Sequence, residues 1–207
     1  MSVQIQHPLA VVTPTLDGDI LTALARADAG FTPGGLARLL SAHSVEGVRR
    51  AVRRLAGQGI VDARQVGRAF EYRLNRDHLA AGPIIALAGQ WRTLLERMEQ
   101  ELSAWRQPPV YGAVFGSAAR GDMRADSDLD VFLVAPDDVD QRYWDGAVAS
   151  FQQVVTRWTG NDTRVLAMSE SEVRAAVRDG APILRSVADE GVAVVGSPSW
   201  LRRLATG

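Results

Sequence analysis

The residues with the clearest chemical pattern lie in the stretch GSAARGDMRADSDLD, residues 116–130. Asp128 and Asp130 are separated by one apolar residue at the entry to an apolar run, LDVFLVA. On a strand, alternate side chains point to the same face, so the two carboxylates share a face roughly 7 Å apart at the backbone. Such a pair suits a hard divalent cation such as Mg²⁺. The alternative is a surface turn, since turns are rich in Gly, Ser and Asp.

The Gly-Ser pair at residues 116 and 117 follows another apolar run, VYGAVF, and precedes a short turn or helix. Backbone N–H groups at such a corner can bind phosphate. Gly116 allows a close approach of the backbone, Ser117 adds a hydroxyl, and Arg120 supplies a positive charge to a phosphate or to the acidic cluster. The stretch therefore predicts phosphate-binding and metal-binding groups side by side, as transfer of a nucleotidyl group from a nucleoside triphosphate requires.

The pattern of Gly-Ser, ten intervening residues and then Asp-x-Asp resembles the signature of the minimal nucleotidyltransferases in the DNA polymerase β-like superfamily. Gly116, Ser117, Asp128 and Asp130 match it, as do Arg-Gly at 120 and 121 and Ser-Asp at 127 and 128. The resemblance covers residues 108–170. It implies transfer of a nucleoside monophosphate from ATP or another triphosphate, with two Mg²⁺ ions on the aspartates. The nucleotide-binding residues that it implies are Gly116, Ser117, Arg120 and Ser127.

Active members of this superfamily usually add a third carboxylate from a later strand. The sequence leaves open whether this chain has such a carboxylate. The strand expected at residues 163–168, TRVLAM, contains no acid. Asp162 lies just before it and is the candidate third catalytic carboxylate if the register turns it inward with Arg164 and Leu166. A register shifted by one would place Ala167 there instead. Without an acid, the domain would bind a nucleotide and transfer it slowly or not at all.

Strands and helices alternate through the part of the chain that carries these residues. Extended runs are expected at 110–115, 129–135, 163–168 and in VAVV near the C-terminus. Helices are expected at 139–158, from Ser169 or Ser171, and at 182–189. This alternation predicts a sheet covered by helices, of the α/β or α+β class.

The N-terminal part has a different organisation, with three short helices followed by a β-hairpin. The second helix is expected to begin at Thr32 as N-cap with Pro33 in its first turn, and to bury Leu36, Leu39 and Leu40. The third begins at Ser44 and buries Val45, Val48, Val52 and Leu55. Two extended runs joined by Val66-Gly67-Arg68 then predict the hairpin.

This order resembles the winged helix-turn-helix domains of the bacterial MarR/ArsR type over residues 11–76. In that family the third helix enters the major groove of DNA and the wing contacts the backbone or minor groove. Residues 38–76 contain nine arginines and three acids, a bias suited to a phosphate backbone. The expected DNA-binding residues are Ser44, Arg49, Arg50, Arg53 and Arg68. A solvated arginine face, or a protein-binding module, is the alternative.

One long helix is expected over residues 83–105, with an apolar stripe close to a heptad seam. The stripe could pair two chains as a homodimer or pack within its own chain. The predicted domains are thus residues 1–80, a linking helix at 81–107, and a nucleotidyltransferase domain at 108–207, an α+β fold overall. His7, His43 and His78 are far apart in the sequence and are expected to be surface or interface residues.

The composition narrows the setting of this chain. Its 207 residues contain no cysteine, which excludes disulfides and thiolate metal sites and favours a cytoplasmic location. No membrane segment is expected, because no apolar run approaches about 18 residues. The expected partners are DNA, a nucleoside triphosphate and an acceptor, such as a HEPN-type toxin or an aminoglycoside. The rival function is a transcriptional regulator whose nucleotidyltransferase-like domain only senses nucleotide.

Overall fold

A computed structural model describes residues 4, 7–124, 126–197, 199–201 and 203 of the chain. By its internal contacts the chain divides into two compact units, one formed by His7–Trp91 and the other mainly by Arg92–Gly207. Within the described ranges, no helix combines the length and the apolar character needed to cross a membrane.

The first unit begins with three helices and a hairpin, as the sequence pattern predicts. Its elements are η1 (Pro8–Val11), α1 (Leu16–Arg26), α2 (Pro33–Leu39), α3 (Val45–Gly57), β1 (Val61–Val66), β2 (Ala69–Leu74) and α4 (Ala81–Ala88). Both expected caps are present, since the Thr32 and Ser44 hydroxyls each accept a hydrogen bond from a backbone N–H at 3.1 Å. Gly67, at the hairpin turn, has a φ of +61°, which favours glycine there.

The core of this unit lies between the three helices and the hairpin. Ile20, Leu36 and Val48 are fully buried in it, and Tyr72 of β2 covers it. Two predicted core residues are not buried, because Leu39 is 58% and Val45 is 44% exposed. They occupy the helix ends that flank the connection between α2 and α3, where the apolar stripe extends past the core.

The expected single helix over residues 83–105 is wrong. The chain forms α4 and then α5 (Gln90–Ser103), separated at Gly89. Gly89 caps α4, with its N–H donating to the Ile85 carbonyl at 3.0 Å, and glycine is a poor helix former. The apolar stripe of α5 is buried within the chain, with Met98 and Leu102 both at 0% exposure. That burial agrees with packing in its own domain, the alternative to pairing with a second chain.

The second unit contains a mixed sheet with strands in the order β5–β4–β3–β6. Its strands are β3 (Tyr111–Phe115), β4 (Leu129–Ala135), β5 (Thr163–Ser169) and β6 (Val192–Val195), close to the predicted runs. β3 is antiparallel to both of its neighbours, whereas β4 and β5 are parallel and joined by a helical crossover, α7 (Gln141–Thr159). These pairings bring the C-terminal end of β3 together with the N-terminal ends of β4 and β5 at one end of the sheet.

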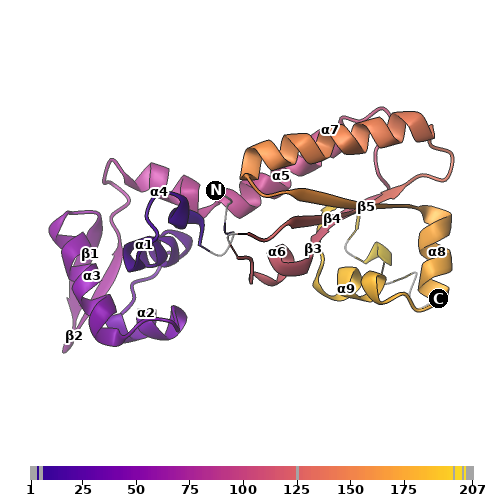
Figure 1. The fold of residues 1–207 in the computed structure, drawn as a ribbon. Helices are drawn as coiled ribbons and strands as arrows, with labels where there is room; N and C mark the ends of the chain where they lie inside the picture. The colour runs from indigo at the N-terminus through magenta and orange to yellow at the C-terminus, as the bar shows by residue number, and fades with distance from the viewer. Residues whose placement is uncertain (1–3, 5–6, 125, 198, 202, 204–207) are drawn as a thin grey trace. The chain divides into compact units, whose positions relative to one another are not determined.

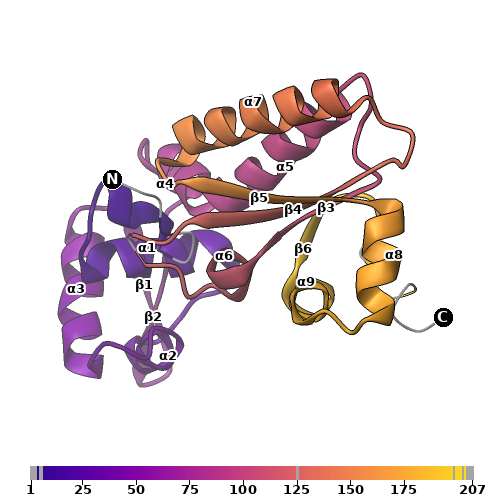
Figure 2. The same cartoon turned by 45° about the vertical axis from the view of Figure 1, so that its right-hand side comes forward.

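Helices cover both faces of this sheet. α5 and α7 lie on one face, and α8 (Glu170–Arg178) and α9 (Pro182–Glu190) lie on the other (Figures 1 and 2). Phe132 and Val134 pack with residues of α8 and α9 in the core of the second face. Asp130 has the same phase along β4 as these two residues, so the alternation of the strand places it on the α8 and α9 face.

Candidate active site

The Gly-Ser pair forms the corner between β3 and the short helix α6 (Gly116–Arg120). Gly116 has a φ of +69°, a conformation that L residues rarely adopt. A Cβ atom at this position would lie 2.6 Å from Oδ2 of Asp130, so the backbone of Gly116 lies directly against that carboxylate. Both the backbone angle and the close approach therefore require glycine. Ser117 follows in the first turn of α6, where helix N–H groups have no partner within the helix.

Asp128 and Asp130 lie at the start of β4, next to this corner. Asp130 is the register partner of Phe115, the last residue of β3. Leu129, between the two aspartates, is 1% exposed, whereas the Asp128 side chain is 29% exposed. The Asp130 carboxylate thus lies against the corner before α6, and Asp128 lies just before β4 with its side chain partly exposed.

The electrostatic environment of Asp130 opposes its ionisation. Burial raises the pKa of the Asp130 carboxyl, and the charge of Asp128 raises this pKa further. The positive charges of Arg164 and Arg120 act in the opposite direction on the same pKa. A further positive charge beside Asp130 would therefore favour its ionised form.

The strand β5 contributes an arginine beside Asp130. Arg164 is the register partner of Asp130 in the parallel β4–β5 pair. Its Nη1 lies 2.8 Å from Oδ2 of Asp128, and its Nε lies 3.7 Å from Oδ2 of Asp162. The Asp162 side chain is 70% exposed just before β5 and joins the cluster through this guanidinium. β5 thus places a base, Arg164, next to Asp130, and the candidate third carboxylate, Asp162, lies just before this strand.

Arg120 is held by acids on two sides. Its Nε lies 3.3 Å from Oδ2 of Asp122, and its Nη1 lies 2.9 Å from Oε2 of Glu190 at the end of α9. The hydrogen bond with Glu190 contributes most to raising the pKa of the Arg120 guanidinium, and the hydrogen bond with Asp122 adds to it. The contact with Glu190 ties α6 to α9, and sequence reasoning missed it because the two residues are 70 positions apart.

The loop that leads to Asp128 is fixed by Ser127 and Asn161. The Ser127 hydroxyl accepts a hydrogen bond from the Arg124 N–H at 2.9 Å. Asn161, 3% exposed, donates from Nδ2 to the Ser127 carbonyl at 3.0 Å. Asn161 was not singled out from the sequence, although a polar residue preceding a strand could have suggested such a role. Ser127 thus shapes the loop in this structure.

The donor set fits a magnesium ion held by two carboxylates. Mg²⁺ is usually bound through one or two carboxylates, with waters and substrate phosphates completing its coordination. Asp128 and Asp130 provide that number of ligands. Among the described residues, no group of three or more His, Asp or Glu side chains is arranged to hold a metal ion. Further ligands would therefore come from a substrate or solvent.

A cavity of about 540 Å³ lies at the other end of β4 and β5, beside α7. Its wall includes Asp137 and Glu172, and both acids are used in starting α8. Asp137 accepts a hydrogen bond from the Ser171 N–H at 2.8 Å, which lowers the pKa of its carboxyl, and Glu172 forms a capping box with Ser169. This cavity is remote along the strands from Asp128 and Asp130.

The residues expected to contact DNA lie on the first unit. Ser44 caps α3, while Arg50 and Arg53 are exposed on that helix. Arg49 lies 2.5 Å from the carboxylate of Glu46, and Arg68 is exposed at the turn of the hairpin. The spacing of 49, 50 and 53 places their side chains on one side of α3.

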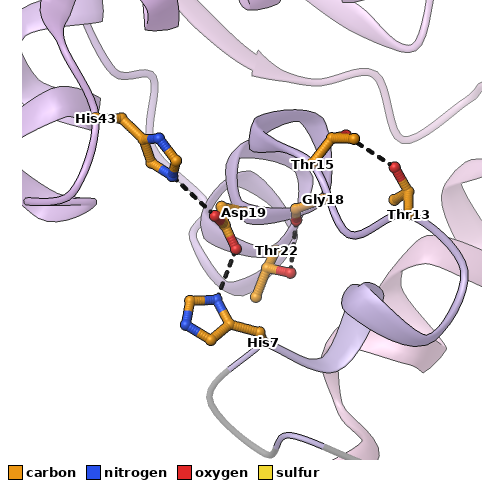
Figure 3. Close-up of polar contacts among 7 residues, drawn as sticks. All are labelled: His7, Thr13, Thr15, Gly18, Asp19, Thr22 and His43. Carbon is orange, nitrogen blue, oxygen red and sulfur yellow. Dashed lines mark hydrogen bonds and ion pairs between the residues drawn. The ribbon is translucent and has the colours of Figure 1, made fainter. Parts of the chain in front are cut away.

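Two histidines that are distant in the sequence share one acid in this unit (Figure 3). Nδ1 of His7 lies 2.7 Å from Oδ1 of Asp19, and Nε2 of His43 lies 3.0 Å from Oδ2 of the same residue. Each carboxylate oxygen therefore has its own imidazole partner. The histidines were expected to be surface or interface residues because they are far apart in the sequence, and only the packing of the segments before α1 and α3 brings His7 and His43 to the same acid.

The sequence of residues 93–168 matches the profile of a family described as Nucleotidyltransferase domain. The comparison with curated proteins found no match.

Solved structures with a similar arrangement include toxin-antitoxin complexes. One, a toxin-antitoxin with AMP-PNP, is 18% identical over 54% of this chain and 81% of its own, with a TM-score of 0.40. A mutant MntA-HpeT toxin-antitoxin is 15% identical over 54% and 81%, with a TM-score of 0.41. A tri-AMPylated HEPN toxin of Shewanella oneidensis in complex with MNT antitoxin is 15% identical over 56% and 81%, with a TM-score of 0.38. At these TM-scores the structural likeness adds nothing to the family match. The family profile, together with the Gly-Ser and Asp-x-Asp residues, identifies residues 93–168 as a nucleotidyltransferase domain.

Proposed function

We propose that this chain transfers a nucleoside monophosphate from ATP or another nucleoside triphosphate to a hydroxyl group, with Mg²⁺ as cofactor. The observation that carries the proposal is the contact between Gly116 and the Asp130 carboxylate, beside Asp128. A glycine corner and two neighbouring acids at one strand edge suit a triphosphate and its cation, whereas a purely structural turn has no use for two carboxylates that repel each other.

Asp128 and Asp130 are the residues that would hold the cation. A bound Mg²⁺ neutralises charge on the phosphates and orients them for in-line displacement. The raised pKa of Asp130 fits this role, because a cation offsets the burial and the repulsion that disfavour its ionised form. A second ion stays a prediction, since its further ligands would have to come from outside this pair.

The remaining residues have roles in binding and in proton transfer. Gly116 and the N–H groups at the start of α6 are proposed to bind the departing phosphates, with Ser117 and Arg120 beside them. A bond forms between the acceptor oxygen and the α-phosphorus while the bond to the pyrophosphate oxygen breaks, and pyrophosphate leaves with that electron pair. The acceptor proton passes to a carboxylate. Asp162 is the candidate, because its exposed side chain is joined to Asp128 through Arg164.

The acceptor is proposed to be a protein hydroxyl, such as that of a HEPN-type toxin, or a small molecule such as an aminoglycoside. The test is incubation of the full chain with nucleotides labelled on the α-phosphate, Mg²⁺ and cell lysate. Label in a protein band supports the first acceptor class, and label in the small-molecule fraction supports the second. We expect transfer to disappear in the double variant Asp128→Asn, Asp130→Asn.

A charge-matched control for this experiment is the double variant Asp138→Asn, Asp179→Asn, at two exposed acids of the same unit. It should transfer label like the wild type. Absence of label transfer with every nucleotide and divalent metal tested would refute the proposed nucleotidyltransferase activity. If the nucleotide nevertheless binds with normal affinity, the favoured function becomes a nucleotide-sensing regulator, a reading supported by Arg164 at the position next to Asp130.

A second proposal is that the first unit is a winged helix-turn-helix domain that binds DNA. It is supported by the exposed side of α3 that carries Arg50 and Arg53, and by Arg68 at the turn of the hairpin. Ser44 lies at the start of α3, which is the end that contacts base edges in such domains. Binding to the upstream region of its own gene would make the chain an autoregulator.

This proposal is tested by titrating the upstream DNA at several salt concentrations. The variant Arg49→Ala, Arg53→Ala, Arg68→Ala should bind more weakly, with the slope of log K against log salt reduced by about 1 for each lost phosphate contact. A matched control replaces three arginines of the same unit that are not among the expected DNA-binding residues, namely Arg54, Arg73 and Arg76, each of which pairs with an acid. Equal affinity and slope in the wild type and the first variant would contradict DNA binding through this face.

A further inference from the structure

Arg164 contacts the carboxylates that the proposed function assigns to a cation. It is the register partner of Asp130, and its Nη1 lies 2.8 Å from Oδ2 of Asp128. Its Nε also lies 3.7 Å from Oδ2 of Asp162. Its single positive charge thus offsets part of the negative charge of three neighbouring acids, two of which it contacts directly.

A divalent cation and this guanidinium cannot both use the same oxygen of Asp128 without repelling each other. The hydrogen bond from Arg164 is charge-assisted, so a metal ion gains the oxygen only by breaking it. The cost of breaking it is modest, because the Arg164 side chain is 65% exposed and exposed ion pairs are weak. Arg164 can therefore be displaced and remain close to the site on its long side chain.

Arg164 is also the more available of the two arginines near the carboxylate pair. Arg120 is engaged by Asp122 and Glu190 at 3.3 and 2.9 Å. Once Asp128 binds a cation, Arg164 retains only its more distant contact with the exposed Asp162. A guanidinium in this position matches the geometry of a phosphate, to which it can donate two hydrogen bonds.

We propose that Arg164 competes with divalent cations for Asp128 and, once displaced, binds the phosphates of the incoming nucleotide. The proposal rests on the proposed function, since it uses the same cation site. Its consequence is coupling between the two ligands. A free cation binds less tightly than it would without Arg164, because it must displace this side chain. A cation that arrives with a triphosphate brings a new partner for the displaced guanidinium.

The test measures binding rather than turnover. Mn²⁺ binding to the full chain is followed by electron paramagnetic resonance without nucleotide, for the wild type and for Arg164→Gln. Removing the competing charge should tighten Mn²⁺ binding by about threefold, in keeping with the strength of an exposed ion pair. The control is Arg178→Gln. Arg178 is the last residue of α8, and this helix follows the C-terminal end of β5, whereas Arg164 lies near the N-terminal end of that strand. This control should bind Mn²⁺ like the wild type, and thermal melting confirms that both variants fold.

The second arm uses α,β-methylene-ATP at saturating Mn²⁺. Arg164→Gln should bind this analogue about tenfold more weakly than the wild type, for loss of one charge-assisted phosphate contact. Unchanged or weaker Mn²⁺ binding in Arg164→Gln would overturn the competition, as would an equal gain in Arg178→Gln. Unchanged binding of the analogue would overturn the role in phosphate binding.

The double variant Asp128→Asn, Asp130→Asn separates this inference from the proposed function. If it binds Mn²⁺ as tightly as the wild type, the cation site has been placed on the wrong residues, and both proposals fail. If it loses Mn²⁺ while Arg164→Gln behaves like the wild type, the cation site stands and only the role of Arg164 is refuted.

Discussion

The substitution Gly116→Ala tests whether the corner before α6 positions Asp130. At Gly116 the φ of +69° is unfavourable for alanine, at a cost of about 1–2 kcal/mol. The new Cβ would lie 2.6 Å from Oδ2 of Asp130. To restore an ordinary contact, the carboxylate must withdraw by about 1 Å.

Both stability and function should respond to this change. We expect the free energy of unfolding to fall by about 1–2 kcal/mol, measured by urea denaturation. The initial rate of label transfer should fall by about 100-fold, because a displacement of about 1 Å in a reacting geometry has an effect of that size. Mn²⁺ binding should weaken as well, since Asp130 is one of its two proposed ligands.

Gly121→Ala is the matched control, because it has the same backbone cost without the contact. Gly121 has a φ of +73°, and no described atom lies within 4 Å of a Cβ at this position outside its chain neighbours. It should lose similar stability but keep its Mn²⁺ affinity. If the two variants lose Mn²⁺ affinity and transfer equally, or if Gly116→Ala transfers like the wild type, the reasoning about Asp130 is refuted.

Three further predictions concern individual residues, namely Asp130, Asn161 and Asp19. Because the pKa of Asp130 is raised, the folded metal-free protein binds this proton more tightly than the unfolded chain does. Its free energy of unfolding should therefore fall as the pH rises from the ordinary pKa of 3.8 through the folded pKa. Asp130→Asn, compared by urea denaturation across pH, should lack this decline. Asn161→Ala should cost about 1–3 kcal/mol and weaken Mn²⁺ binding, because the Ser127 carbonyl loses its partner; normal Mn²⁺ affinity would show that the loop holds Asp128 without it. Asp19→Ala should destabilise the first unit by about 0.5–1 kcal/mol in thermal or urea unfolding, since two histidine rings lose their shared partner. An unchanged transition would show that these partly exposed contacts do not contribute to stability.

The sequence by itself determined the local elements and the chemical motif. Thr32 and Ser44 were identifiable as caps because a cap depends on residues within one helical turn. The strand at 129–135 was evident from its apolar run between turn residues, and alternation along it predicted one face for Asp128 and Asp130. Gly116 was assigned to a close backbone approach, although the sequence did not reveal that its neighbour would be Asp130.

Only the tertiary structure decided which residues from distant segments meet. The parallel register of β4 and β5 places Arg164 beside Asp130, and that register depends on how the crossover helix α7 packs on the sheet. The contact of Arg120 with Glu190 requires α9 to fold back against α6. The sharing of Asp19 by two histidines likewise depends on segment packing. Periodicity and caps are short-range signals, whereas register and contacts between elements follow from packing the whole core, which a single segment does not encode.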